Sequence, residues 1–195
     1  MQQKYAQTQE TISPWNTASK TRDDLTPFAA DNIDSQIQLR PIQLSDAPRV
    51  KDLMTMAISR PLSIAPIHKI NEAQDFILGK NSNQNIRLGI SHSRHGLIGG
   101  ISYGFEKATP NQNYVLFSYW LGEAYQRQGH TFNALTLLFN HLRSQGNTDF
   151  LAKVYPSNTP SQHLLKKLGF QYNEISTSKD PSTFIHFTRL GPQIP

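Results

Sequence analysis

One short stretch of the chain combines residue types that could hold a phosphate group. An apolar segment, residues 113–121, precedes a polar loop, residues 126–131, and an amphipathic helix follows. The first backbone N–H groups of a helix have no partner within the helix, and the helix dipole attracts negative charge to them. Gly129 lets the backbone approach a ligand closely, and Arg127 adds a full positive charge. We therefore predict an anion-binding site at this helix start.

The sequence of the loop excludes two common nucleotide-binding motifs. It lacks the Gly-Lys-Ser/Thr of a Walker loop and the first glycine pair of a dinucleotide fingerprint. Taken alone, Gln-x-x-Gly also fits a glycine that serves only to cap a helix. The surrounding elements must decide whether this loop is an anion-binding site or only the cap of a helix.

A second polar motif, Asn158-Thr-Pro-Ser161, opens another predicted helix later in the chain. The buried-looking segment 150–154 precedes it, and Lys167-Leu-Gly-Phe170 ends the helix, with Gly169 as a left-handed cap. The two motifs thus follow each other in the order strand, loop, helix, strand, helix, an order that builds an anion site at a helix start. The second motif is therefore expected to complete the site begun by the first.

The rest of the pattern supplies elements that can position these loops. Strands are predicted at residues 36–40, 86–91, 97–103, 113–121, 150–154, 172–175 and 183–190. Helices are predicted after N-cap residues Ser45 or Asp46, after Asn71, from about His130 to Gly146, and over 159–168, with an irregular loop at 59–68. The sum is an α+β layout in which a β–α–β–α unit follows an antiparallel meander.

Length and composition indicate one domain with an N-terminal extension. Residues 1–35 are polar and aperiodic, so we expect a flexible or loosely docked extension, and residues 36–195 form the domain. No apolar run approaches the ~20 residues that span a bilayer. No apolar signal segment begins the chain, so we expect a cytoplasmic protein without a membrane partner. The absence of Cys excludes disulfides, thiol nucleophiles and cysteine-based zinc sites.

Charge adds little to this interpretation. The first 36 residues hold three basic and five acidic side chains, a net charge of −2. Because the whole chain has a net charge of +5, the remaining residues carry +7. A basic domain favours anionic partners such as coenzyme phosphates. No compact Lys/Arg cluster with interleaved aromatic residues indicates a nucleic-acid surface, and we do not expect nucleic acid as the partner.

The two motifs together resemble the coenzyme A site of the GNAT superfamily of N-acetyltransferases. Residues 36–190 resemble the branch that acetylates ribosomal-protein N-termini and related amines. The resemblance implies a GNAT fold with a mixed sheet of about six to seven strands and about four helices. It implies acetyl-CoA as co-substrate, no metal, and an amine substrate on a protein N-terminus or small molecule. The oligomeric state stays open between monomer and homodimer.

The same resemblance assigns site residues. The implied coenzyme contacts are Tyr119, Trp120, Leu121, Gln126, Arg127, Gln128, Gly129, His130, Thr131, Asn158 and Ser161. The backbone of Tyr119 would lie beside the acetyl carbonyl, and Ser161 would be catalytic by donating a hydrogen bond to the departing thiolate. Thr131 stands where the superfamily usually has Gly or Ala, and Leu165 stands where many members have a Tyr general acid.

Two points stay open at the level of sequence. The general base is unassigned among Glu106, Glu123, Glu174 and Asp180, with Tyr103 or Tyr119 as residues that could orient a water molecule. The expected function is acetyl transfer to a primary amine by direct attack. The alternative is a GNAT-fold module that binds CoA or a protein partner without turnover.

Overall fold

The computed structural model describes residues 28–29, 36–80, 86–109, 112–173 and 185–189. The strands are β1 (Phe28–Ala29), β2 (Ile37–Pro41), β3 (Ile86–His92), β4 (Gly96–Thr109), β5 (Gln112–Leu121), β6 (Phe150–Val154), β7 (Gln171–Asn173) and β8 (Ile185–Arg189). The α-helices are α1 (Ala47–Leu53), α2 (Met56–Ser59), α3 (Ile70–Leu78), α4 (His130–Ser144) and α5 (Thr159–Lys167). Three short 3₁₀ turns are η2 (Leu44–Asp46), η3 (Arg60–Leu62) and η4 (Glu123–Tyr125).

All described strands belong to one mixed sheet with the order β1-β2-β3-β4-β5-β6-β8-β7. Strands β1 to β5 are antiparallel neighbours, β5 and β6 are parallel, and β8 lies between β6 and β7. The predicted α+β architecture, a meander followed by a β–α–β–α unit, is confirmed. The eight described strands exceed the predicted six to seven, since a two-residue β1 pairs with β2.

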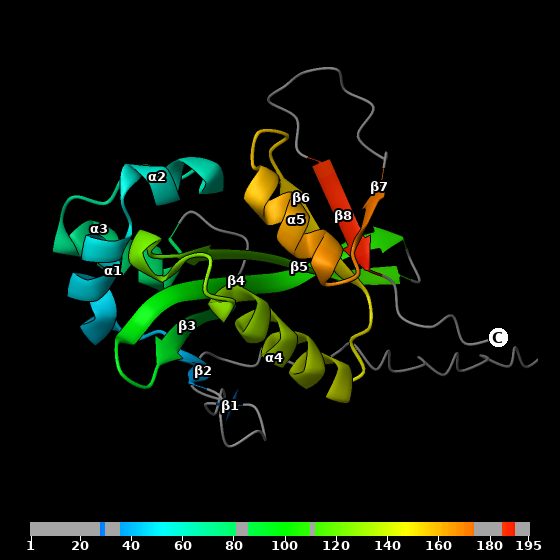
Figure 1. Cartoon of the computed structure of the whole chain (residues 1–195), viewed down its shortest axis with the longest axis horizontal. Coiled ribbons are helices and arrows are strands. Elements are labelled where there is room, and N and C mark those ends of the chain that lie inside the picture. The colour runs from blue at the N-terminus through cyan, green and yellow to red at the C-terminus, as the bar shows by residue number, and fades with distance from the viewer. Residues whose placement is uncertain (1–27, 30–35, 81–85, 110–111, 174–184, 190–195) are drawn as a thin grey trace, which may run out of the picture.

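Helices cover the two faces of the sheet (Figure 1). Each face has its own hydrophobic core. One core, under α4 and α5, includes Phe117, Phe139 and Phe170, whose rings lie 5.1–5.6 Å apart. The other, under α1 to α3, includes Trp120, whose ring meets Phe76 edge-on at 6.3 Å. Successive residues of β5 thus serve opposite faces, as the alternation of a strand requires.

Three local predictions are corrected by the structure. Asn71 does not cap a helix, because α3 begins at Ile70 with Lys69 as its N-cap and Asn71 lies in its first turn. Asp46 does not cap α1 with its side chain, because its carboxylate accepts hydrogen bonds from the Gln43 N–H at 2.8 Å and from the Arg40 guanidinium at 2.7 and 2.8 Å. Residues 59–68 were predicted as an irregular loop, but their start is helical: α2 ends at Ser59 and runs into η3. Most of residues 1–35 lies outside the described residues, so the proposed extension remains a prediction.

Gly99 fixes how closely β4 and β5 approach. A Cβ built on Gly99 would lie 2.5 Å from the Trp120 carbonyl oxygen, which is backbone and can move only with the strand. We expect Gly99→Ala to lower the free energy of unfolding by about 1–3 kcal/mol, as overpacked sites do. Urea denaturation would measure this loss. Gly96→Ala is a comparison for backbone strain alone, because its φ of 63° strains any L side chain while a Cβ there meets no atom within 4 Å. Equal stability of wild type and Gly99→Ala would contradict the packing argument.

A search of the described residues for helices long and apolar enough to cross a membrane found none.

Candidate functional site

Strands β5 and β6 separate soon after they pair. Their register covers only Val115 with Phe150 and Leu116 with Leu151, although β5 continues to Leu121 and β6 to Val154. On its other side, β5 stays paired with β4 as far as Leu121. The sheet therefore contains a gap, lined on one side by the last five residues of β5.

Backbone alternation decides which residues of β5 face this gap. The Val115 N–H donates to the Asp149 carbonyl on the β6 side, whereas the Gly122 N–H donates to the carbonyl of Ile98 in β4. In an antiparallel ladder, the direction of the backbone groups alternates with each residue. The N–H and C=O groups of Phe117, Tyr119 and Leu121 therefore point into the gap.

This alternation separates the three predicted strand contacts. Tyr119 and Leu121 present backbone groups to the gap, while Trp120 pairs with Gly100 of β4 and buries its ring in the core on the other face. The Leu121 carbonyl is already occupied, because it accepts a hydrogen bond of 3.0 Å from the Gln126 side chain. Of the residues that face the gap, Tyr119 is therefore the one nearest the end of β5 whose carbonyl is not taken up by the Gln126 side chain.

The loop after β5 is shaped as the anion-site prediction requires. Arg127 and Gly129 both adopt the left-handed conformation, with φ of 61° and 80°, and Gly129 is the N-cap of α4. The first intrahelical bond runs from the Asn133 N–H to the Gly129 carbonyl, so the N–H groups of residues 130–132 have no helical acceptor. No side chain caps this helix start.

The side chains of the loop leave this helix start open to solvent. Gln126, Arg127, Gln128 and Gly129 are exposed, and His130 and Thr131 are half-buried. The Gln128 amide donates to the Ala124 carbonyl at 3.0 Å, and its oxygen lies 3.2 Å from the His130 ring nitrogen. The Gln128 side chain therefore stabilises the loop, while the backbone N–H groups at the start of α4 stay available to a ligand.

The second motif comes close to Tyr119 of β5. Asn158 is the N-cap of α5, and its side-chain oxygen accepts a 3.3 Å hydrogen bond from the Ser161 N–H. The Tyr119 hydroxyl is buried and has no hydrogen-bond partner among the described residues. Burial raises the pKa of Tyr119 to about 12, and the neighbouring Ser161 side chain acts in the opposite direction. Two hydroxyls, one from β5 and one from α5, thus lie close together beside the gap.

Together, these features fit an extended, phosphate-bearing ligand. Free backbone groups on a strand edge pair with amide groups of a ligand, as in strand addition. Unpaired N–H groups at the start of α4 suit a pyrophosphate, and an orphaned buried hydroxyl suits a polar group that enters the gap. The residues present therefore match the chemistry of CoA from its thiol end to its pyrophosphate.

Comparison with known proteins identifies the family. A sequence model described as the acetyltransferase (GNAT) domain matches residues 36–171. The chain belongs to this family. No curated protein sequence matches it significantly.

Solved structures share the GNAT fold with this chain. One is the Microcin C7 self-immunity acetyltransferase MccE in complex with acetyl-CoA and AMP, with TM-score 0.66 and 20% identity over 80% of this chain and 93% of that chain. Another is an acetyltransferase of Salmonella typhimurium that modifies the N-terminal serine of the 50S ribosomal protein L7/L12, with TM-score 0.64 and 18% identity over 82% and 97%. A third is RimL in complex with CoA, with TM-score 0.63 and 18% identity over 82% and 96%.

The candidate bases of this GNAT domain lie in different surroundings. Glu106 is half-exposed and holds the Lys153 ammonium at 3.1 Å through both carboxylate oxygens. Glu123 is exposed and accepts a hydrogen bond from the Thr55 hydroxyl. Glu174 and Asp180 lie outside the described residues. Tyr103 is buried, which raises its pKa to about 12. The described residues therefore leave the base of the GNAT domain unassigned.

Sequence reasoning missed a histidine cluster next to the α4 start. The His92 ring lies 4.7 Å from the His95 ring and 5.2 Å from the His130 ring, between centroids. His92 Nδ1 accepts the Arg94 N–H at 3.1 Å, so Nε2 carries the proton and donates to Gln36 at 2.8 Å. Among the described residues, no group of three or more side chains is arranged to hold a metal. The nearness of His130 to the β3–β4 turn depends on the tertiary fold, and no local motif signals it.

The histidines make the stability of the GNAT domain pH-dependent. Burial lowers the pKa of His92, and the neighbouring His95 and His130 lower it further; burial also lowers the pKa of His130 and His186. At mildly acidic pH the unfolded chain therefore binds more protons than the folded chain does. The free energy of unfolding falls as the pH drops below about 6.5, the histidine pKa in the unfolded chain. Each proton of difference contributes about 1.4 kcal/mol per pH unit.

We expect urea unfolding to show this loss between about pH 6.5 and pH 5, above the range in which carboxylates titrate. His92→Asn keeps an acceptor for the Arg94 N–H but does not titrate, so its stability should fall less steeply. The matched control is His163→Asn, at an exposed position on α5. Identical slopes for wild type and His92→Asn would contradict this assignment.

Proposed function

We propose that the chain is an N-acetyltransferase that transfers an acetyl group from acetyl-CoA to a primary amine. The observation that supports it most is the gap between β5 and β6, where the backbone of Tyr119 and the hydroxyls of Tyr119 and Ser161 come together. Family membership and the CoA complexes among the structural neighbours agree with this proposal.

In this proposal the coenzyme lies along the splayed edge of β5. The Tyr119 N–H is placed to polarise the acetyl carbonyl, and the loop of residues 126–131 holds the pyrophosphate on the open N–H groups of α4. Trp120 contributes through its ring, which anchors β5 to the opposite core, because its backbone is committed to β4. Asn158 contributes by capping α5 and thereby fixing Ser161.

The two hydroxyls beside the gap have the chemistry needed by a leaving thiolate. Acetyl-CoA supplies an activated acyl group: the amine nitrogen forms a bond to the carbonyl carbon, and the C–S bond breaks. Tyr119 keeps its proton at neutral pH because burial raises its pKa to about 12, and Ser161 is a neutral donor at any working pH. Hydrogen bonds to a charged group are worth about 1.5–3 kcal/mol. We propose that Ser161 and Tyr119 jointly donate to the departing sulfur.

The acceptor amine is proposed to approach from the opposite face of the sheet. The alternation that sends Tyr119 toward α4 and α5 sends Ser118 to the other face, where its hydroxyl lies 3.3 Å from that of Ser102. Glu106 and Lys153 lie on the same face. This polar surface suits a polar amine substrate. The activity described for the Salmonella neighbour makes a protein N-terminus the first acceptor to test.

The test uses the full-length protein. CoA and acetyl-CoA at millimolar concentration should raise the melting temperature by mass action, and a panel of amines and N-terminal peptides should contain an acceptor that releases free CoA thiol. No thermal shift with either ligand would overturn the proposal.

A binding module without turnover is the second candidate. It is favoured by the missing Tyr at Leu165, which is fully buried, and by the unassigned base. Thermal stabilisation by CoA, combined with no thiol release across the whole panel, would support this alternative over the enzyme.

A further inference from the structure

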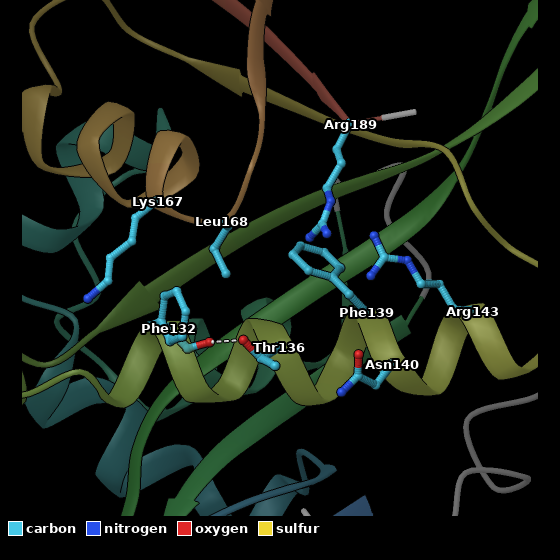
Figure 2. A pocket seen from close by; sticks show the side chains of 8 residues that line it. All are labelled: Phe132, Thr136, Phe139, Asn140, Arg143, Lys167, Leu168 and Arg189. Carbon is cyan, nitrogen blue, oxygen red and sulfur yellow. Dashed lines mark hydrogen bonds between the residues drawn. The ribbon is translucent and has the colours of Figure 1, made fainter. Parts of the chain in front are cut away.

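A basic pocket lies between the outer face of α4, the C-terminal end of α5 and β8 (Figure 2). Its volume is about 270 Å³. Arg143 from α4 and Arg189 from β8 both reach toward the Phe139 ring, and Lys167 from α5 lies toward the other end. Residues far apart in the sequence are thus gathered into one hollow by the fold.

The three cations are held without acidic partners in the described part of the chain. None of the residues that line the pocket is acidic, and no described salt bridge includes Arg143, Arg189 or Lys167. Aromatic rings hold two of them instead: the Arg143 guanidinium lies 5.4 Å from the Phe150 ring centroid, and the Lys167 ammonium lies 4.9 Å from that of Phe132.

Holding like charges together costs free energy that an anion would recover. Burial lowers the pKa of Arg143, and the positive charge of Arg189 lowers it further, so the charged form of the Arg143 guanidinium is destabilised by its position. A phosphate between them would accept hydrogen bonds from both planar forks, which match phosphate geometry. The exposed Asn140 side chain adds a further polar group at the pocket.

The arginine pair is too far from the start of α4 to serve a coenzyme bound there. Arg143 lies thirteen positions beyond His130 on the same helix, which corresponds to about 20 Å at 1.5 Å per residue. The pyrophosphate and the 3′-phosphate of CoA are attached to the same ribose. They cannot span that length while the pyrophosphate rests on the helix start.

We propose that the pocket between α4, α5 and β8 binds the phosphate group of a small phosphorylated ligand through Arg143 and Arg189. This site is separate from the coenzyme cradle, which consists of the gap between β5 and β6 and the loop of residues 126–131. Its volume is slightly below the roughly 300–1,000 Å³ of pockets for drug-sized ligands. It therefore suits an organic phosphate of about the size of a pentose phosphate. The separation from the cradle rests on the proposed coenzyme position, whereas the phosphate site itself does not.

The experiment titrates full-length, isotope-labelled protein with inorganic phosphate and with ribose 5-phosphate, using ribose as the uncharged control. Amide shifts are followed by NMR with and without saturating CoA. We expect both phosphates, but not ribose, to shift Thr136, Asn140 and Arg189, and we expect these shifts to persist with CoA present. Tighter binding of ribose 5-phosphate than of phosphate would show that the pocket takes an organic ligand, and equal binding would reduce the site to free phosphate and overturn the organic-ligand assignment.

Variants make the assignment specific. Arg143→Gln and Arg189→Gln should each weaken phosphate binding roughly tenfold, the loss expected for one charge-assisted contact. Arg60→Gln, an exposed arginine on η3 with the same change in net charge, should bind as wild type does. If a variant does not fold, the amide shifts of the wild-type protein show by themselves whether phosphate binds at the pocket. Wild-type affinity in both pocket variants, or shifts confined to residues 129–132 and abolished by CoA, would overturn the site. Absence of CoA binding would overturn the proposed function and leave the phosphate result standing.

Discussion

Replacing Gly129 with leucine is expected to weaken CoA binding roughly 100-fold or more and to leave the fold intact. Gly129 has φ of 80°, and a Cβ there meets no atom within 4 Å, so the side chain would project into open space at the start of α4. That space is where the proposed pyrophosphate lies. Loss of two contacts to a charged group, at about 1.5–3 kcal/mol each, accounts for the size of the effect.

The chain contains a closely matched control for this change. Gly146, just beyond the other end of α4, has φ of 85° and likewise no atom within 4 Å of a built Cβ. Gly129→Leu and Gly146→Leu should therefore carry the same backbone strain, roughly 1–2 kcal/mol. Calorimetric titration with CoA and urea unfolding of both variants separate strain from binding. Equal CoA affinity in the two variants would place the coenzyme elsewhere.

Removing the hydroxyls beside the gap is expected to slow turnover while coenzyme binding persists. Tyr119→Phe and Ser161→Ala should each lower kcat about 10- to 100-fold, because each deletes a hydrogen bond to a thiolate that carries charge only as the bond breaks. If the two hydroxyls act on one sulfur atom, the double variant should lose less than the product of the single losses. Steady-state thiol release with saturating acetyl-CoA measures these effects.

Tyr172→Phe is the control, since Tyr172 is an exposed tyrosine on β7 to which no catalytic role is assigned. It should retain wild-type kcat. A Tyr119→Phe enzyme with unchanged kcat would remove the phenol from the mechanism. A change in the KM for acetyl-CoA alone would assign it to binding.

The sequence predicts the order of elements and the two loops because both depend on short-range patterns. Strand 150–154, the helix starts near His130 and Asn158, and the glycine at the head of α4 are encoded in alternation, helical spacing and cap residues, and the structure has them there. Errors arise where a residue finds a distant partner. Asp46 is a good cap by type, but the guanidinium of Arg40 and the Gln43 N–H draw its carboxylate away from α1.

The chemistry of the site depends on contacts that no local pattern encodes. From the sequence, Tyr119 is predicted to contact the coenzyme through its backbone and is one of two tyrosines that could orient a water molecule, whereas the position of its hydroxyl beside Ser161 comes from the structure alone. Similarly, His130 reaches His92, and Arg189 reaches Arg143, across long stretches of chain. Burial removes water around Tyr119, His92, His130 and Arg143, and the resulting changes in their pKa follow from packing.

The short pairing of β5 with β6 also bears on how the molecule holds together. With only two residue pairs in register, the sheet consists of a larger half, β1 to β5, and a smaller half, β6 to β8, which meet along a narrow seam. Hydrogen bonds contribute little across such a seam, so α4 and α5 must supply most of the cohesion through the aromatic core beneath them. A ligand bound in the gap would then contact both halves and hold them together, so the smaller half would gain rigidity when the site is filled.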